Sequence, residues 1–305
     1  MNKVHSARHG RIGSPVSRPT SWWLKTLKQR AETMYEDEEK LPPVAFASDE
    51  ERRACISFFN AALRAEESGS AQAEHLAASM RAIDPDLAEC LSLYGAEENW
   101  HRGLIVEFLR EIGGEVQPLG GMTGFFYRTY AKARHLPTIM LSNLMFEVIG
   151  STTYRIALGR VKHPAVRKML TILARDESFH VPLNVHFIRE FRRHRGVTPT
   201  ERVWLELVYH ALFWLLIASS AASRRVAQSF DQISFAELSH AYAENLARLF
   251  VHEDDLRFKP PWLALRLFGL RKHELAEGEN ILSTAAAEAS ARRRDVAVSA
   301  IPAGG

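Results

Sequence analysis

Two short segments of the chain repeat one arrangement of side chains that could bind a metal ion. The segment AEENWH contains Glu98 and His101, and the segment ARDESFH contains Glu177 and His180. Residues three positions apart lie on one face of an α-helix, so a carboxylate and an imidazole at this spacing can hold one ion. A single Glu-x-x-His pair arises by chance on solvated helices. The second copy favours metal binding over a structural glutamate–histidine hydrogen bond.

Each pair follows a candidate glutamate by about thirty residues. Glu147 is the single charge in the apolar run LMFEVI, whereas the earlier candidate is Glu66 or Glu67. Adjacent residues on a helix point roughly 100° apart, so only one of these two can face inward. They follow Leu63 by three and four positions, so periodicity does not decide, and a solvated acidic pair is the alternative. Two helices with one Glu and two with Glu-x-x-His form the pattern of di-iron or di-manganese carboxylate bundles.

Small residues follow both candidate glutamates. Residues 68–71 read SGSA, and residues 150–153 read GSTT. The first group would let a neighbouring helix or a metal site come close. The second could leave a cavity beside the metals or merely pack a tight helix crossing.

An acid directly precedes the glutamate of each pair. A metal-bound histidine usually donates its other ring N–H to a carboxylate. Because the motif occurs twice, each time with a preceding acid, it predicts a crossed arrangement. In this arrangement Asp176 accepts a hydrogen bond from His101, and Glu97 accepts one from His180. Solvated salt bridges are the alternative. Tyr154 follows Glu147 by seven positions and returns to the same helix face, either beside the site or as a core tyrosine.

Helix start signals indicate the elements that must position these residues. Ser48 and Glu51 form a capping box, and Asp84-Pro85, Pro137 and His163-Pro164 open three further helices. Residues 114–137 are the expected long crossover. The fold class is all-α, a four-helix bundle with additional N- and C-terminal helices. We expect residues 1–47 to be a basic, partly disordered segment with a short helix and residues 48–196 to be the metal-binding bundle. Residues 197–283 are expected to be a helical extension, and residues 284–305 a disordered tail.

Composition indicates a globular protein with a sizeable core and gives no strong electrostatic case for nucleic-acid binding. The 305 residues are 46% hydrophobic, enough for a sizeable core, and 39 Lys and Arg against 36 Asp and Glu leave a net charge of only +3. Cys55 and Cys90 form no Cys-x-x-Cys pair, which argues against a disulfide scaffold, a zinc knuckle and a built-in rubredoxin-type iron site. The N-terminus lacks the apolar core of a secretory signal. We expect a cytoplasmic protein.

The most apolar run of the chain is residues 203–222, VWLELVYHALFWLLIASSAA. It approaches membrane-spanning length, but Glu206 and His210 interrupt it. A buried fifth helix that packs against the bundle and helps to line an apolar substrate pocket is the first interpretation. A membrane-associated helix is the second. We interpret His210 as a core histidine rather than a ligand.

These motifs resemble the ferritin-like di-iron carboxylate superfamily, which includes rubrerythrins, ribonucleotide reductase small subunits, acyl-carrier-protein desaturases and several di-iron oxygenases. AEENWHRG is similar to the Glu-Glu-Asn-x-His-Gly helix of desaturases, and HPAVRKMLTILARDESFH is similar to the fourth helix of rubrerythrins and desaturases. AEES at 65–68 is similar to the first metal helix of rubrerythrins, which favours Glu67 over Glu66. The resemblance covers about residues 48–192. The chain departs from rubrerythrins in lacking a rubredoxin domain and the extra third-helix carboxylate, and from ferritins in its two full Glu-x-x-His pairs.

The resemblance implies two iron ions, with manganese as the alternative metal. The implied ligands are Glu67, Glu98, His101, Glu147, Glu177 and His180, of which Glu67, Glu147 and Glu177 are expected to take part in catalysis. The implied reaction is O2 activation to hydroxylate, desaturate or N-oxygenate an apolar or carrier-bound substrate. A separate ferredoxin or reductase would supply electrons. The alternatives are a ferroxidase or peroxide scavenger and a metal-stabilised structural or binding protein. We also predict that the protein can form a homodimer and can contact a membrane peripherally through residues 203–222. We expect no nucleic-acid partner.

Overall fold

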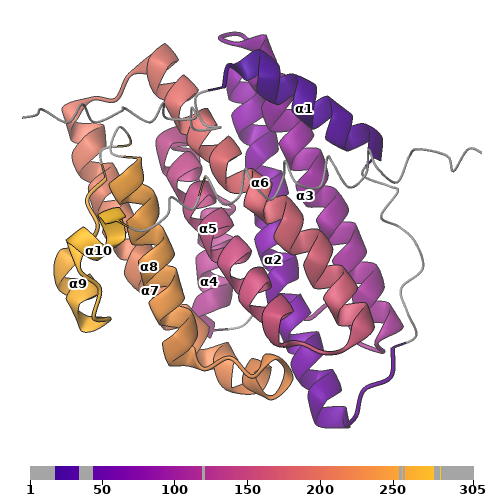
Figure 1. Ribbon diagram of the computed structural model, residues 1–305. Helices are drawn as coiled ribbons and strands as arrows, with labels where there is room; N and C mark the ends of the chain where they lie inside the picture. Colours follow the sequence, from indigo (N-terminus) through magenta and orange to yellow (C-terminus); the bar gives the residue numbers. More distant parts are fainter. Residues whose placement is uncertain are drawn as a thin grey trace, which may run out of the picture.

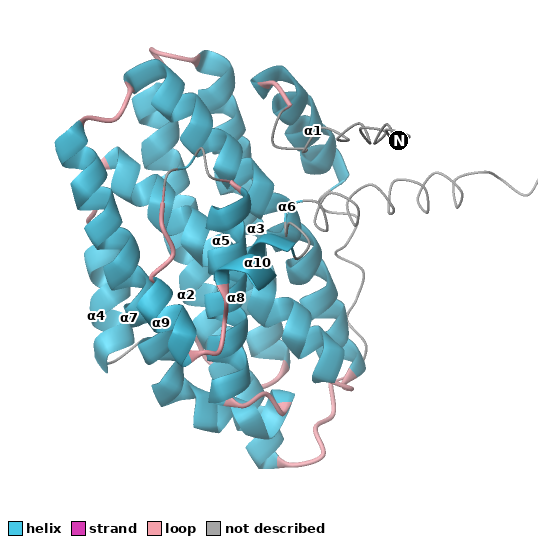
Figure 2. Ribbon diagram, turned by 60° about the vertical axis from the view of Figure 1, so that its left-hand side comes forward, coloured by secondary structure: helices cyan, strands magenta, loops and turns pink. Residues whose placement is uncertain are grey.

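The computed structural model describes residues 18–33, 44–118, 121–253, 256, 258–277 and 282. Within these residues all regular structure is helical and no strand occurs, which confirms the expected all-α class (Figure 2). The tail 284–305, expected to be disordered, and most of the segment 1–47, expected to be partly disordered, lie outside the described residues.

Four long helices form the bundle (Figure 1). They are α2 (Asp49–Met80), α3 (Pro85–Glu111), α5 (Leu136–Arg160) and α6 (Pro164–Arg195). Short turns join α2 to α3 and α5 to α6, so each pair is antiparallel. Contacts between α2 and α5 and between α3 and α6 close the four helices around a common interior.

The ends of the first two bundle helices follow the sequence signals. Ser48 Oγ accepts a hydrogen bond from the Glu51 backbone N–H at 3.1 Å, and Asp84 Oδ1 accepts one from Leu87 at 3.0 Å. These bonds satisfy backbone donors that the first turn of a helix leaves free. After α3 the chain reverses at Gly113, whose φ of +69° favours glycine. The predicted N-caps at Ser48 and Asp84 are confirmed.

The connector between α3 and α5 contains helix α4 (Gly121–Tyr130) and runs back along α2. Near the start of α2, the Asn60 side chain bonds the backbone of Glu115 and Gln117. Farther along α2, Gln72 Nε2 donates to the Tyr130 carbonyl at 2.7 Å. The connector therefore returns to the end of the bundle where α3 begins, and α5 runs parallel to α3. This confirms the predicted position of the long crossover.

The apolar core of the bundle has two clusters, one at each end. One surrounds Leu91 and Phe187, and the other surrounds Phe59 and Phe108. Buried charged side chains lie between the clusters, near the middle of all four helices. The bundle thus encloses a charged layer between two apolar layers.

Segment 203–222 lies in α7 (Pro199–Asp231), which packs against α2 and α5, as the first interpretation requires. Leu205, Tyr209 and Phe213 are buried on its inner side. On its outer side Leu207 is 60% exposed and Trp214 is 44% exposed, so burial is one-sided. None of the described helices combines the length and the hydropathy needed to cross a membrane.

The expectation of a core histidine at position 210 is wrong. The side chain of His210 is 41% exposed, with Nε2 3.9 Å from Glu206 Oε2. The histidine and the glutamate are four positions apart and share one partly solvated face of α7. In the part of the chain that the structure describes, α7 is followed by α8 (Phe235–His252), α9 (Trp262–Leu267) and α10 (Lys272–Glu277).

Helix α1 (Thr20–Thr33) lies outside the four-helix arrangement and packs against α3 (Figure 1). Its buried Trp23 also contacts α6, with ring centroids 5.5 Å from Phe179 and 5.7 Å from His186. Thr20 Oγ1 lies 3.2 Å from His186 Nε2. These contacts fix α1 over the seam between α3 and α6.

Candidate metal centre

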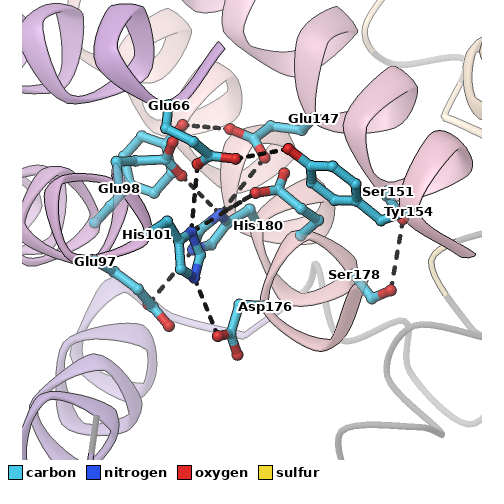
Figure 3. Close-up of polar contacts among 12 residues, drawn as sticks. Glu66, Glu97, Glu98, His101, Glu147, Ser151, Tyr154, Asp176, Ser178 and His180 are labelled. Carbon is cyan, nitrogen blue, oxygen red and sulfur yellow. Dashed lines mark hydrogen bonds and ion pairs between the residues drawn. The ribbon is translucent and has the colours of Figure 1, made fainter. Parts of the chain in front are cut away.

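Six side chains from the four bundle helices converge in the charged layer, and we call them the six-ligand site. They are Glu66 of α2, Glu98 and His101 of α3, Glu147 of α5, and Glu177 and His180 of α6. Figure 3 shows the labelled members pointing toward one another. All six are at most 5% exposed.

The ligand atoms of this site form two groups of four that overlap. Glu66, Glu98, His101 and Glu177 make up the first, and Glu98, Glu147, Glu177 and His180 make up the second; within each group the atoms lie within 4.8 Å of one another. Glu98 and Glu177 belong to both groups. Each half of the site therefore has its own glutamate and histidine and shares two carboxylates with the other half.

Both histidines direct Nδ1 toward the carboxylates. His101 Nδ1 lies 3.4 Å from Glu66 Oε2, and His180 Nδ1 lies 2.8 Å from Glu98 Oε1 and 3.5 Å from Glu147 Oε2. None of these atoms has an aligned hydrogen-bond partner among the described residues. Orphaned polar atoms are costly in a buried site. A metal ion that accepts these lone pairs would satisfy them, so the residues present fit a two-metal centre.

Glu66, and not the predicted Glu67, is the glutamate of α2 that faces the site. Glu67 points outward, with Oε2 2.6 Å from Arg64 Nη1, and its side chain is 45% exposed. Glu66 follows the buried Phe59 by seven residues, about two helical turns, so both lie on the inner face. The preference for Glu67 is thereby corrected. The surface pairing of Arg64 with Glu67, three positions apart, was a sequence signal that could have decided the choice.

Glycines make room for the two shared carboxylates. A Cβ atom at Gly69 would lie 2.7 Å from Glu98 Oε2, and one at Gly150 would lie 3.3 Å from Glu177 Oε2. The small residues after Glu66 and Glu147 thus allow close packing onto ligand side chains. The cavity that Ser151, Thr152 and Ser178 help to line measures only about 10 Å³, the space of about one water molecule.

The two acids that precede the ligand glutamates, Glu97 and Asp176, contact the histidines in the crossed arrangement that the sequence predicts. We call them the outer acids. Asp176 Oδ2 is hydrogen bonded to His101 Nε2 at 3.1 Å, and Glu97 Oε2 lies 3.4 Å from His180 Nε2. Each carboxylate comes from the helix opposite its histidine. Both outer acids are buried, so neither is a solvated surface group.

Two arginines that sequence reasoning missed neutralise the outer acids. Arg30 of α1 donates hydrogen bonds to Glu97 and, at 2.7 Å, to Asp176 Oδ1. Arg175 Nε donates to Asp176 Oδ1 at 2.6 Å. Arg30 follows the buried Trp23 by seven positions, so both lie on the same face of the helix. An arginine on the apolar face of a predicted amphipathic helix could have indicated a buried acidic partner.

A tyrosine donates to each unshared glutamate. Tyr154 Oη donates to Glu66 Oε1 at 2.9 Å, and Tyr94 Oη donates to Glu147. Tyr154 therefore lies beside the candidate site, and its ring also belongs to the apolar cluster around Phe59 and Phe108. Tyr94, four positions before Glu98 on α3, was missed as a site residue.

Burial and mutual repulsion control the protonation of the ligand groups. Burial, together with the charges of Glu147 and Glu66, raises the pKa of Glu98 and Glu177 well above the usual carboxyl range. Burial alone would lower the pKa of His101, but the hydrogen bond with Asp176 and the nearby Glu66 carboxylate raise it to about 10. Protons therefore compete for the same lone pairs that would bind metal.

The pKa values of the two outer acids are lowered, in contrast to those of Glu98 and Glu177. Burial would raise the pKa of Glu97, but the nearby Arg30 charge outweighs burial and lowers it to about 2. The pKa of Asp176 is likewise held well below its usual range by Arg30, by the hydrogen bond to His101 and by Arg175. Both outer acids remain anionic acceptors at neutral pH.

Comparison of the chain with known protein families, with curated proteins and with solved structures finds no match to any of them. The geometry of the six-ligand site and of its outer acids is therefore the basis for a functional assignment. What it establishes is a buried, all-helical site whose carboxylates and imidazoles could hold metal ions.

Proposed function

We propose that this protein is a di-iron oxidoreductase that activates O2 to oxidise an apolar or carrier-bound organic substrate. The observation that carries the proposal is the pair of overlapping four-ligand groups sharing Glu98 and Glu177. Four glutamates and two histidines on four helices match the ligand pattern of ferritin-like di-iron carboxylate proteins. Carboxylate and imidazole ligands suit iron, with manganese as the alternative. When bound, a di-iron pair supplies the electrons that reduce O2.

The chain's own residues would divide the work of holding two ions. Glu66 and His101 would bind one ion, Glu147 and His180 the other, and Glu98 and Glu177 would span both. Asp176 is hydrogen bonded to Nε2 of His101, and Glu97 lies 3.4 Å from Nε2 of His180, so Nδ1 of each histidine is the nitrogen directed into the site. Tyr94 and Tyr154 hold protons at their hydroxyl oxygens beside the unshared glutamates.

The apolar layers on both sides of the site support oxidation chemistry on an apolar substrate. Phe187 lies in one layer and Phe108 in the other, and both side chains are fully buried. Such surroundings exclude water, so hydrogen bonds and charges act more strongly there than in solvent.

We propose that a separate ferredoxin or reductase delivers the electrons. The homodimer, the membrane contact through 203–222 and the cytoplasmic location stay predictions.

Anaerobic reconstitution with ferrous iron tests the proposal. We expect about two irons per chain, an oxo-bridged di-ferric absorption band after exposure to air, and O2 consumption that depends on an added apolar substrate. Saturation near one metal, or tetrahedral zinc alone, would contradict it. Peroxide consumption without substrate would favour a scavenger, and stable metal without redox cycling would favour a structural role.

A further inference from the structure

Arg30 brings a positive charge to the site from a helix outside the four-helix arrangement. Its guanidinium lies 4.3 Å from the centroid of the Phe179 ring and is hydrogen bonded to both outer acids. We propose that Arg30 is a positioning residue that completes the metal centre and orients both metal-binding histidines. The inference rests on the proposed function, because it requires the six-ligand site to bind two ions.

The balance of charge explains why the site needs this residue. The four glutamates of the six-ligand site match the charge of two divalent ions. Glu97 and Asp176 add two further buried negative charges, which are costly unless they are paired. Arg30 and Arg175 supply the two matching positive charges.

The shape of the guanidinium allows one side chain to act on both histidines. Arginine presents its N–H donors in a rigid planar fork, whereas lysine has one compact ammonium group. Arg30 fixes Glu97, which lies 3.4 Å from His180 Nε2, and Asp176, which is bonded to His101 Nε2. An anionic acceptor on Nε2 orients the ring and increases the basicity of Nδ1. Among the described residues, Arg30 is the cation that contacts both outer acids.

The position of α1 does not depend on Arg30 alone. Trp23 and Leu27 are each 1% exposed, and Lys28 Nζ forms a 2.8 Å ion pair with Glu89 of α3. Substitution of Arg30 should therefore leave α1 in place while removing the contact with the outer acids. This separates a positioning role from a role in holding α1.

The test uses Co²⁺ as a spectroscopic probe in the full-length protein. Titration followed by visible absorption gives the affinity of each ion. Proton NMR of the Co²⁺ form shows the exchangeable imidazole N–H signals shifted by the paramagnetic ions. For Arg30→Gln we expect affinity for both ions to fall about 10- to 100-fold and both N–H signals to broaden or disappear through faster exchange.

Three further variants sharpen the test. Arg175→Gln should affect mainly the N–H signal of His101, because Arg175 is bonded to Asp176. Arg30→Lys keeps the charge without the fork and should restore only part of the affinity. Lys28→Gln, on the same helix but paired with Glu89, is the matched control and should bind Co²⁺ like the wild type.

Unchanged affinities and unchanged N–H signals in Arg30→Gln would overturn the inference. If Arg30→Gln does not fold, Arg30→Lys provides the test instead. Wild-type Co²⁺ affinities and N–H signals in Arg30→Lys would show that the planar guanidinium is not needed and would overturn the inference. A wild-type protein that fails to bind two Co²⁺ ions would instead count against the proposed function, so the two failures are distinguishable.

Discussion

The Nε2 atom of His101 lies 3.1 Å from Oδ2 of Asp176, although the two residues belong to different helices and are 75 positions apart. This hydrogen bond leaves Nδ1 of the same ring facing Glu66 Oε2 at 3.4 Å. The contact therefore determines which nitrogen of His101 is available to a metal.

Asp176→Asn tests the importance of the charge in this contact. The amide keeps the shape of the side chain but removes the anionic acceptor. We expect the fold to persist and metal affinity, measured by Mn²⁺ titration, to fall about 10- to 100-fold. Asp86→Asn, at an exposed position on α3, is the control. Equal affinity in the two variants would show that Asp176 does not tune His101.

Glu66→Ala and Glu67→Ala should differ sharply in metal content. Glu66 is 2% exposed and contributes to the first four-ligand group, so its truncation should remove at least one bound ion. Glu67 forms an exposed ion pair with Arg64, so its loss should change stability by about 0.5 kcal/mol or less and leave both ions bound. Metal analysis of the reconstituted variants checks this. The opposite result would mean that α2 is rotated by one residue.

Gly69→Ala should impair metal binding while the chain still folds. The new Cβ would lie 2.7 Å from Glu98 Oε2, and the flexible Glu98 side chain, rather than the backbone, would have to move. Because Glu98 is a shared carboxylate, affinity for both ions should fall. Gly103→Ala is the control, since its Cβ meets no atom within 4 Å, and alanine in a helix should stabilise α3 by about 0.5–1 kcal/mol. A Gly69→Ala protein with normal metal content would show that the carboxylate position is not critical.

Metal binding should release protons and become tighter as pH rises. The metal-free His101, with its pKa raised to about 10, holds a proton at neutral pH that must leave before Nδ1 can bind an ion. Affinity should therefore increase with pH until about 10 and weaken in acid. The outer acids do not add to this dependence near neutral pH, because the pKa of Glu97 is about 2. Calorimetry of Mn²⁺ binding in buffers of different ionisation enthalpy measures the protons released, and zero release would contradict the expectation.

Local chemistry made the helix starts and the crossed outer acids predictable from the sequence. Ser48 and Asp84 cap helices through bonds to residues three positions away, and the repeated motif placed Asp176 opposite His101. The choice between Glu66 and Glu67 was harder, because one residue of helix rotation separates an inner position from a surface position. Arg30 could not be paired from periodicity, since its partner Asp176 is 146 positions away.

The distance along the chain between Arg30 and Asp176 also sets an order of assembly. Helix α1 is the first described helix to be synthesised, but the surface that holds it includes α6, which is made 146 residues later. At about 5–20 residues per second, this delay is on the order of ten seconds. Arg30 and Glu97 are both made before Asp176, so the contact of Arg30 with both outer acids can form only after this part of α6 has been synthesised. The charges of the outer acids are therefore fully balanced only once the last of the four bundle helices has joined the other three.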